Sequence, residues 1–303
     1  MEYLFIFLKG FAMGAANVIP GVSGGTIAFI TGVYDRLIDA LKSCDFRAVQ
    51  LLLKGKFVDF AKKIDLGFLA SLGLGAVTSI LTLAKVLKHA YVEHPVLVSA
   101  FFFGLILASI FSVARMVKKW GSSEVMALII GLAVAVGLSF LSQASENPNP
   151  VYLAVCGVAA MCSMIIPGVS GSFILLLMGN YKLIMLDAVD DLRQLNLAEA
   201  LPILVPVGIG AIIGLVALSH VLSWLFKKYH DVAVSLITGF VAGSLVIIWP
   251  WKEPLYSSEF PDKVIAWKRM LPELHTSTGV ALGWIAIGVI IIVAMEKFSK
   301  NKA

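Results

Sequence analysis

Hydrophobic residues form long runs along this chain, and polar residues gather in short stretches between them. Several runs exceed the roughly 18 apolar residues that a helix needs to cross a bilayer. In each half, one apolar segment is interrupted by a Pro-Gly pair and three continuous segments follow it. The pattern predicts an all-α polytopic membrane protein. Charged residues make up only 14% of the 303 residues, which is too few to cover the core of a soluble protein of this size.

The two halves of the chain repeat residue by residue, which indicates an internal duplication. Residues 19–24 are Ile-Pro-Gly-Val-Ser-Gly and recur unchanged at 166–171. Further along, Gly32-x-Tyr34 matches Gly179-x-Tyr181, and Gly73-Leu74-Gly75-Ala76 parallels Gly208-Ile209-Gly210-Ala211. An identical run that includes Pro, Ser and two Gly is too long for a chance match between low-complexity membrane segments.

We expect two repeats, each a re-entrant broken-helix hairpin followed by three transmembrane helices. The first repeat, 1–145, has its hairpin at 3–41, a basic interfacial helix at 45–63 and spans at 66–84, 95–114 and 125–143. The second repeat, 151–303, has its hairpin at 151–186 and spans at 201–225, 232–249 and 279–295. Residues 250–275 are expected to form an external interfacial cap. Full spanning of the broken segments is the alternative, and the short length of these segments favours hairpins.

Loop charges predict the orientation of the repeats, because Lys and Arg gather on the cytoplasmic side. The basic loop residues are Arg36, Lys42, Arg47, Lys54, Lys56, Lys62, Lys63, Arg115, Lys118, Lys119, Lys227, Lys228, Lys297, Lys300 and Lys302. The acidic loop carries Asp187, Asp190, Asp191 and Glu199 against Arg193 alone. One hairpin and three spans per half satisfy every loop, place both termini in the cytoplasm and turn the second repeat upside down, as in secondary transporters. The net charge of +5 follows from this bias, so we expect no nucleic-acid partner.

The Pro-Gly breaks are the candidate binding site. Lipid cannot satisfy broken backbone, so such breaks survive only inside protein or beside a water-filled cavity. The segment after each break starts with glycines and hydroxyl residues, and N–H groups at a helix N-terminus favour an anion. The expected anion-binding residues are Asn17, Gly21, Ser23, Gly24, Gly25, Thr26, Gly168, Ser170, Gly171 and Ser172. Simple helix capping by Ser23 and Ser170 is the alternative, and duplication of the whole break favours a substrate role.

A hydrolase is the alternative from the enzyme class. Residues 21–25 fit the G-x-S-x-G pattern, but the strand that this motif needs before its serine is missing. An intramembrane protease would need a histidine base from another span, and His220 is the only histidine within an expected span. Cys44, Cys156 and Cys162 lack metal-ligand spacing. We therefore expect no enzyme, no cofactor and no metal.

The stretch Gly-Ala-Ala-Asn-Val-Ile-Pro-Gly-Val-Ser-Gly-Gly-Thr at 14–26, together with Pro-Gly-Val-Ser-Gly-Ser at 167–172, resembles the bacterial polyprenyl-phosphate transporter family, long catalogued as a domain of unknown function. The resemblance covers essentially the whole chain. It implies a flippase of the cytoplasmic (inner) membrane that returns undecaprenyl phosphate from the outer to the inner leaflet for lipid-carrier recycling in cell-wall synthesis. It also implies that both motifs bind the headgroup, with Arg36 as a further cation. Lys182 or its neighbour is the matching cation after the second hairpin, and snorkelling at the interface is the alternative for both.

The expected mechanism is alternating access around the paired helix ends. Inward movement of negative charge against an inside-negative potential costs about 2.3 kcal/mol per charge per 100 mV. A phosphate monoester carries roughly −1.5 to −2 charges near pH 7, so a coupling proton or cation is expected. No Asp or Glu lies mid-membrane in the sequence, which makes the phosphate itself the expected proton carrier. A carrier for a small soluble anion remains the alternative, and the oligomeric state and preferred prenyl length stay open.

Overall fold

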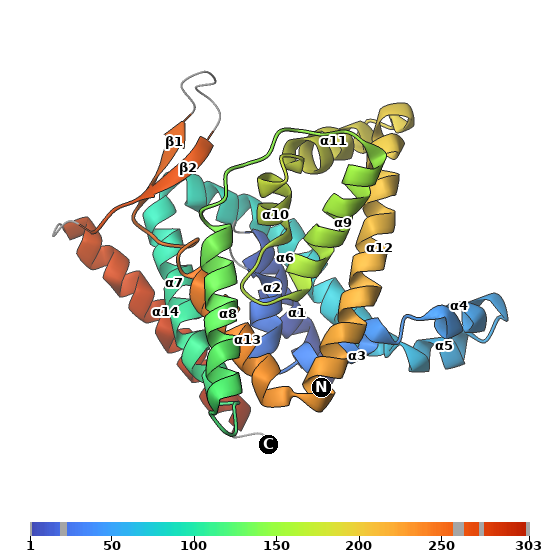
Figure 1. Ribbon diagram of the computed structural model, residues 1–303, viewed down its shortest axis with the longest axis horizontal. Coiled ribbons are helices and arrows are strands. Elements are labelled where there is room, and N and C mark those ends of the chain that lie inside the picture. The colour runs from blue at the N-terminus through green and yellow to red at the C-terminus, as the bar shows by residue number, and fades with distance from the viewer. Residues whose placement is uncertain (1, 19–22, 257–263, 273–275, 301–303) are drawn as a thin grey trace.

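The computed structural model describes residues 2–18, 23–256, 264–272 and 276–300, and nearly all of its regular structure is helical (Figure 1). The first half contains α1 (Glu2–Val18), α2 (Gly24–Ile30), α3 (Tyr34–Lys42), α4 (Phe46–Leu53), α5 (Phe57–Lys63), α6 (Leu66–Glu93), α7 (Pro95–Ala114) and α8 (Ser122–Leu138). The second half contains α9 (Pro150–Ile165), α10 (Gly171–Leu177), the π-helical turn η1 (Lys182–Asp187), α11 (Ala188–Arg193), α12 (Leu197–Lys228), α13 (His230–Ser244) and α14 (Thr276–Lys300). An antiparallel hairpin of β1 (Lys252–Tyr256) and β2 (Val264–Arg269) precedes α14.

The helices have the length and surface of a multi-pass membrane protein. Within the described ranges, four helices are long and apolar enough to cross a membrane, namely α6, α7, α12 and α14, and α8 and α9 are apolar but shorter. Large hydrophobic side chains such as Leu81, Ile212 and Ile290 point outward and are exposed. Such side chains are stable in contact with lipid, because the hydrocarbon does not expose their apolar surface to water.

The two broken segments approach the middle of the molecule from opposite ends (Figure 1). The helix α1 starts at the lower end of the view, where the N-terminus is marked, and α2 turns back toward that end. The helix α9 starts at the upper end, and α10 turns back toward the upper end. The breaks therefore lie between the two ends, surrounded by the longer helices.

Glycines bring the broken segments into backbone contact with the long helices. In the pair α1 and α6, a methyl group at Gly75 would collide with the backbone of Phe7. In the pair α9 and α12, a methyl group at the repeat-related Gly210 would collide with the backbone of Ala154. Small residues allow membrane helices to pack this closely. The two halves thus use the same glycine position for the same contact.

The remaining spans pack across the halves. The helix α8 of the first half lies on α13 of the second, and α14 of the second half lies on α7 of the first. Glycines again mark both crossings, because a methyl group at Gly239 would collide with Leu128 of α8, and one at Gly104 would collide with Ile285 of α14. The halves therefore exchange their last spans and do not form two separate bodies.

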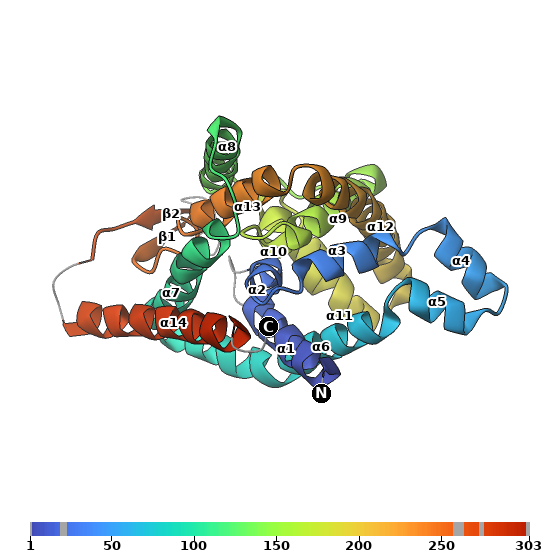
Figure 2. The same cartoon turned by 90° about the horizontal axis from the view of Figure 1, so that it is seen from below.

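Three expectations from the sequence need correction. The interfacial segment 45–63 is two helices, because Gly55 ends α4 with φ +71° and the N–H of Lys56 bonds to the carbonyl of Leu51. The span expected to end at 84 continues to Glu93, since no Gly or Pro interrupts the chain before Pro95. The segment 250–275, expected only to be an interfacial cap, contains the β-hairpin. Figures 1 and 2 show α4 and α5 projecting from the body.

The basic segments gather at one end of the molecule. The elements α3 to α5, the α7–α8 and α12–α13 junctions and the final turns of α14 lie at the lower end of Figure 1, which faces the viewer in Figure 2. These elements carry most of the basic loop residues, whereas α11, with Asp190 and Asp191, lies at the opposite end. We call the lower end of Figure 1, where these basic elements lie, the basic end.

We predict that replacing Gly75 or Gly210 with alanine lowers the free energy of unfolding by about 1–3 kcal/mol, because the added methyl group must push two backbones apart. Gly73→Ala and Gly208→Ala are matched controls on the same two helices, since open space surrounds both positions. Alanine there should be neutral or raise helix stability by up to about 1 kcal/mol. Thermal unfolding in detergent would measure the difference, and equal transition temperatures for all four variants would contradict the packing.

Candidate functional site

The two breaks meet, and each supplies hydrogen-bonding groups that the other needs. The N–H of Gly168 in the second break donates to Oγ1 of Thr26 in α2 at 2.9 Å. The hydroxyl of Tyr34, at the start of α3, donates to the carbonyl of Ile165 at the end of α9 at 3.0 Å. Both bonds are buried. Two motifs that lie far apart in sequence therefore form one polar centre.

The N-terminal end of α2 is closed by its own side chains. Ser23 caps the helix by accepting from the N–H of Gly25 at 3.2 Å. The N–H of Gly24 donates to Oδ1 of Asn17, in the segment before the break, at 2.8 Å. Ser23 is only 2% exposed. In this conformation, the first motif already satisfies the donors that we expected to face an anion.

The N-terminal end of α10 differs, although its motif is the same. Ser170 makes no side-chain capping bond, and its hydroxyl lies 2.9 Å from that of Ser172. Met164 takes the place that Asn17 has in the first half, because the space beside Gly171 is filled by its Cγ and Sδ atoms. A thioether is a weak acceptor. This end therefore has two half-buried hydroxyls and no amide cap.

Close packing explains why glycines occupy the breaks. Gly168 has φ +90°, a backbone conformation that L side chains rarely adopt, and a Cβ atom there would lie 2.6 Å from the carbonyl oxygen of Phe240. At Gly25, a Cβ atom would lie 3.0 Å from the carbonyl oxygen of Ile165. The first hairpin thus rests directly on the end of α9. Gly21, also expected in the site, lies outside the described residues.

Comparison with known proteins identifies the family of this chain. A family model described as undecaprenyl phosphate translocase-like matches residues 13–262, a range that contains both breaks. The chain belongs to this family. A polyprenyl-phosphate transporter of Vibrio cholerae serotype O1 is 38% identical over 311 residues, covering 99% of this chain and 98% of the relative.

A second relative is more distant. A polyprenyl-phosphate transporter of Staphylococcus aureus is 27% identical over 274 residues, which cover 86% of this chain and 88% of the relative. No solved structure matches the chain. The relatives are transporters, so the family is not one of enzymes.

The contacts of Ser23 and His220 contain no catalytic pair. The hydroxyl of Ser23 caps α2. The Nδ1 atom of His220 lies 2.8 Å from the carbonyl of Val216 in its own helix, and its side chain is exposed. Neither group is oriented by the other, as a nucleophile and its base must be.

The two expected headgroup cations are paired with carboxylates at the edges of the protein. Arg36 bonds Glu2 and Asp65 at 2.7 Å each, and its guanidinium lies 4.5 Å from the centre of the Phe68 ring. Bonds to Asp65 and Glu2 raise the pKa of Arg36. Lys182 lies 3.2 Å from Asp187. These contacts fix α3 against α1 and α6 and hold η1, and they do not bring either cation to the breaks.

Lys9, a charged residue within the first hairpin, was not among the site residues predicted from the sequence. The ammonium of Lys9, in the middle of α1, donates to the carbonyl of Thr31 at the C-terminal end of α2, at 2.7 Å. A positive charge suits a helix C-terminus. A lysine inside an apolar segment is the signal that could have revealed it. Lys9 therefore joins the two arms of the first hairpin.

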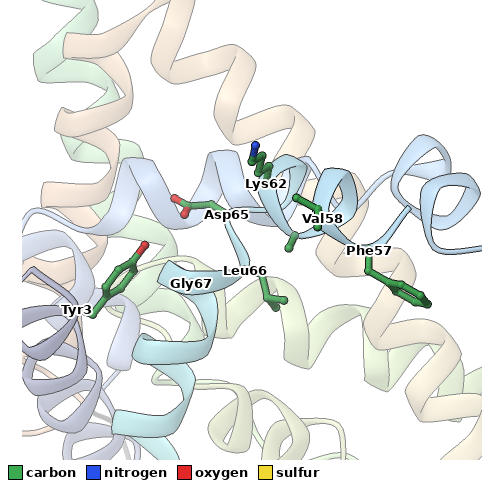
Figure 3. A pocket seen from close by; sticks show the side chains of 8 residues that line it. Tyr3, Phe57, Val58, Lys62, Asp65, Leu66 and Gly67 are labelled. Atoms are coloured by element: carbon green, nitrogen blue, oxygen red, sulfur yellow. The ribbon is translucent and has the colours of Figure 1, made fainter. Parts of the chain in front are cut away.

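The larger cavities lie away from the breaks. One of about 640 Å³ lies beside α1, α5 and α6 (Figure 3), with Tyr3, Lys62 and Asp65 on its rim. Another of about 670 Å³ lies between the α6–α7 turn, the β-hairpin and α14. Burial, reinforced by the charge of Arg269, lowers the pKa of Lys252 in that cavity to about 8. The described residues of the breaks line neither of these two cavities.

We predict that Thr26→Val lowers the free energy of unfolding by about 1–3 kcal/mol, because it leaves the buried N–H of Gly168 without an acceptor. Thr26→Ser is the matched control, since it keeps the hydroxyl. Thermal unfolding of the purified protein would compare the two. If serine and valine lower the transition temperature equally, the hydrogen bond between the breaks is not what stabilises them.

Proposed function

We propose that this chain is a flippase that moves a polyprenyl phosphate, such as undecaprenyl phosphate, from the outer to the inner leaflet of a bacterial cytoplasmic membrane. The main support is the meeting of two identical broken motifs from opposite ends of a membrane protein of this family. The names of both relatives support the same substrate class. Return of the lipid phosphate would allow its reuse as a carrier in cell-wall synthesis.

The proposed architecture is a pair of inverted repeats. The opposite entry of the two hairpins supports it, and so do the repeated glycine contacts of Gly75 and Gly210. The basic end would face the cytoplasm according to the distribution of Lys and Arg in its loops. Both the start of α1 and the end of α14 lie at that end (Figure 1). An inverted pair can present one site to either side of the membrane.

The proposed phosphate site is the polar centre between α2 and α10. Ser170 and Ser172 supply hydroxyls, and the N–H groups at the start of α10 lack an amide cap. Gly168 and Gly171 are buried in this conformation and leave the backbone there without side chains. The residues of the first motif (Asn17, Gly21, Ser23, Gly24, Gly25 and Thr26) would complete the site from the other half. Asn17 would leave Gly24 when a phosphate replaces it as acceptor. The prenyl tail would stay in the surrounding lipid.

The contact pattern indicates which parts would move. Glycines fix α1 on α6 and α9 on α12, whereas the two hairpins meet mainly through α2 and α9. The exchanged spans α7, α8, α13 and α14 would form the scaffold. Movement of the α1–α6 pair against the α9–α12 pair would open the polar centre to one end or the other.

The charge of the substrate calls for coupling. Moving one negative charge inward costs about 2.3 kcal/mol for each 100 mV of inside-negative potential. For a phosphate with roughly −1.5 to −2 charges, the cost is on the order of 3–5 kcal/mol per 100 mV. A proton or cation that accompanies the lipid would reduce it. Transport that responds neither to pH nor to potential would contradict coupling.

We predict that purified protein in liposomes moves a fluorescent polyprenyl phosphate inward, and that Ser170→Ala/Ser172→Ala slows this movement roughly tenfold or more. Hydrogen bonds to a charged group contribute about 1.5–3 kcal/mol each. Ser163→Ala is the control, because that hydroxyl bonds the carbonyl of Ala160 in its own helix at 2.8 Å. Competition by short-chain lipid phosphates, but not by inorganic phosphate, is expected. Uptake of a small anion without lipid movement would overturn the lipid substrate.

We predict that Met164→Asn slows transport while it stabilises the protein. The new amide would cap α10 as Asn17 caps α2, and would compete with the phosphate for the same N–H groups. Met164→Leu is the control of similar size without an acceptor. Transport rates and unfolding temperatures would be compared. Equal transport by both variants would argue against a phosphate at the end of α10.

A further inference from the structure

A small cavity lies at the basic end, where the two halves face each other. It has a volume of about 170 Å³ and lies between α3 of the first half and α12 and α13 of the second. Its lining residues are Asp35, Ile38, Asp39, Ser223, Phe226, Lys227 and His230. The cavity thus places two carboxylates of one half opposite a lysine and a histidine of the other.

Asp39 has its partners within this cavity. Its Oδ1 atom accepts from the hydroxyl of Ser223 at 3.0 Å and lies 3.2 Å from the ammonium of Lys227. Lys42 also donates to the hydroxyl of Ser223 at 3.2 Å. The charge of Asp39 is therefore balanced by groups of α12, which holds α3 against the second half.

Asp35 has no such partner. One helical turn before Asp39, the carboxylate of Asp35 makes no hydrogen bond or ion pair with any residue in the described ranges. The helix α3 lies outside the spanning helices. Burial raises the pKa of Asp35, the positive charge of His230 lowers it, and the negative charge of Asp39 raises it. Asp35 is thus a carboxyl group that can hold a proton more readily than a solvated one.

His230 is held in place from its other side. Its Nδ1 atom lies 3.1 Å from Oδ1 of Asp231, whose other oxygen accepts from the backbone N–H groups of Lys118 and Lys119 at the α7–α8 junction. The charged or titratable groups around Asp35 are therefore Tyr34, Arg36, Asp39 and Lys42 on α3, Lys227 on α12 and His230 and Asp231 on α13, and α2 has none.

A chain of rings joins this cavity to the polar centre. His230 contacts the ring of Phe226, Phe226 contacts Tyr34, and Tyr34 contacts Phe29 of α2, with centroid distances of 6.1, 5.8 and 5.1 Å. The hydroxyl of Tyr34 bonds to Ile165 in the second break. Asp35 directly follows Tyr34 in the sequence, so a shift of α3 at the cavity would also move the link between the breaks.

We propose that Asp35, in the cavity that it shares with Asp39 and His230, is the binding site of the coupling proton at the basic end. With the proton bound, Asp35 is neutral beside Asp39, and α3 is held against α12 and α13. Without it, two carboxylates lie together, and the contact loosens. The proton comes from the bulk solution or from the lipid phosphate and leaves to water on this face. This inference rests on the proposed function, because coupling presupposes transport of a charged lipid.

Infrared titration of the protein in liposomes would test proton binding without requiring transport. The difference between the spectra of wild type and Asp35→Asn should contain the band of a protonated carboxylic acid that disappears as pH rises. Asp39→Asn should shift the transition to lower pH, because the charge that raises the pKa of Asp35 is removed. His230→Gln should shift it to higher pH, because the charge that lowers that pKa is removed. Identical spectra of wild type and Asp35→Asn at every pH, or shifts in the same direction in the other two variants, would overturn the proposal.

Transport at different pH values on the basic side is the second measurement. Wild type should show a pH-dependent rate, and Asp35→Asn a rate independent of pH. The profile should shift to lower pH in Asp39→Asn and to higher pH in His230→Gln. Asp59→Asn on α5 is the control carboxylate, for which the wild-type profile is expected. A pH dependence that survives Asp35→Asn would disprove coupling through this site. A normal infrared titration in a protein that moves no lipid would instead refute the proposed function and leave the proton site standing.

Discussion

A helix that breaks inside a membrane leaves N–H and C=O groups that only protein can satisfy, because hydrocarbon offers them no partner. In this molecule, the second break depends on the first half of the chain. Gly168 donates to Thr26, and Ile165 accepts from Tyr34. The second half does not satisfy its own break alone. The packing of α8 on α13 and of α14 on α7 likewise joins the two halves. The duplicated chain therefore folds as one unit, and its polar centre exists only in the assembled protein.

The chain contains two identical motifs that the structure uses differently. Asn17 accepts from Gly24 in the first half, and Met164 fills the equivalent space in the second. One helix end is therefore capped by an amide, whereas the other retains two hydroxyls that bond mainly to each other. A site made of two equal ends would hold an anion equally from both sides. The difference between an amide and a thioether is sufficient to make the two ends unequal in a single conformation.

The sequence predicts the features that depend on local pattern, and misses those that depend on contacts between distant residues. Apolar runs and Pro-Gly pairs predict the helices and the breaks, and the repeat predicts that Gly75 and Gly210 share a role. Gly55 could have revealed the end of α4. In contrast, no local signal indicates that Arg36 is paired with Glu2 and Asp65, or that Tyr34 reaches Ile165. Loop charges predict a side of the membrane, and they do not identify the partner of each charge.

The distribution of tight and weak contacts limits the possible movements. Backbone-to-backbone crossings at glycines cannot separate without losing many close contacts at once, and two of the four main crossings join the halves. Rocking of one complete half against the other would break those two. The hairpins, however, are joined by hydrogen bonds that each contribute only about 0.5–1.5 kcal/mol net. A phosphate supplies strong acceptors for the same N–H and O–H groups, so its arrival would offset the loss of the bonds between the breaks. The ligand that suits the polar centre is therefore also the one whose binding would let the hairpins part.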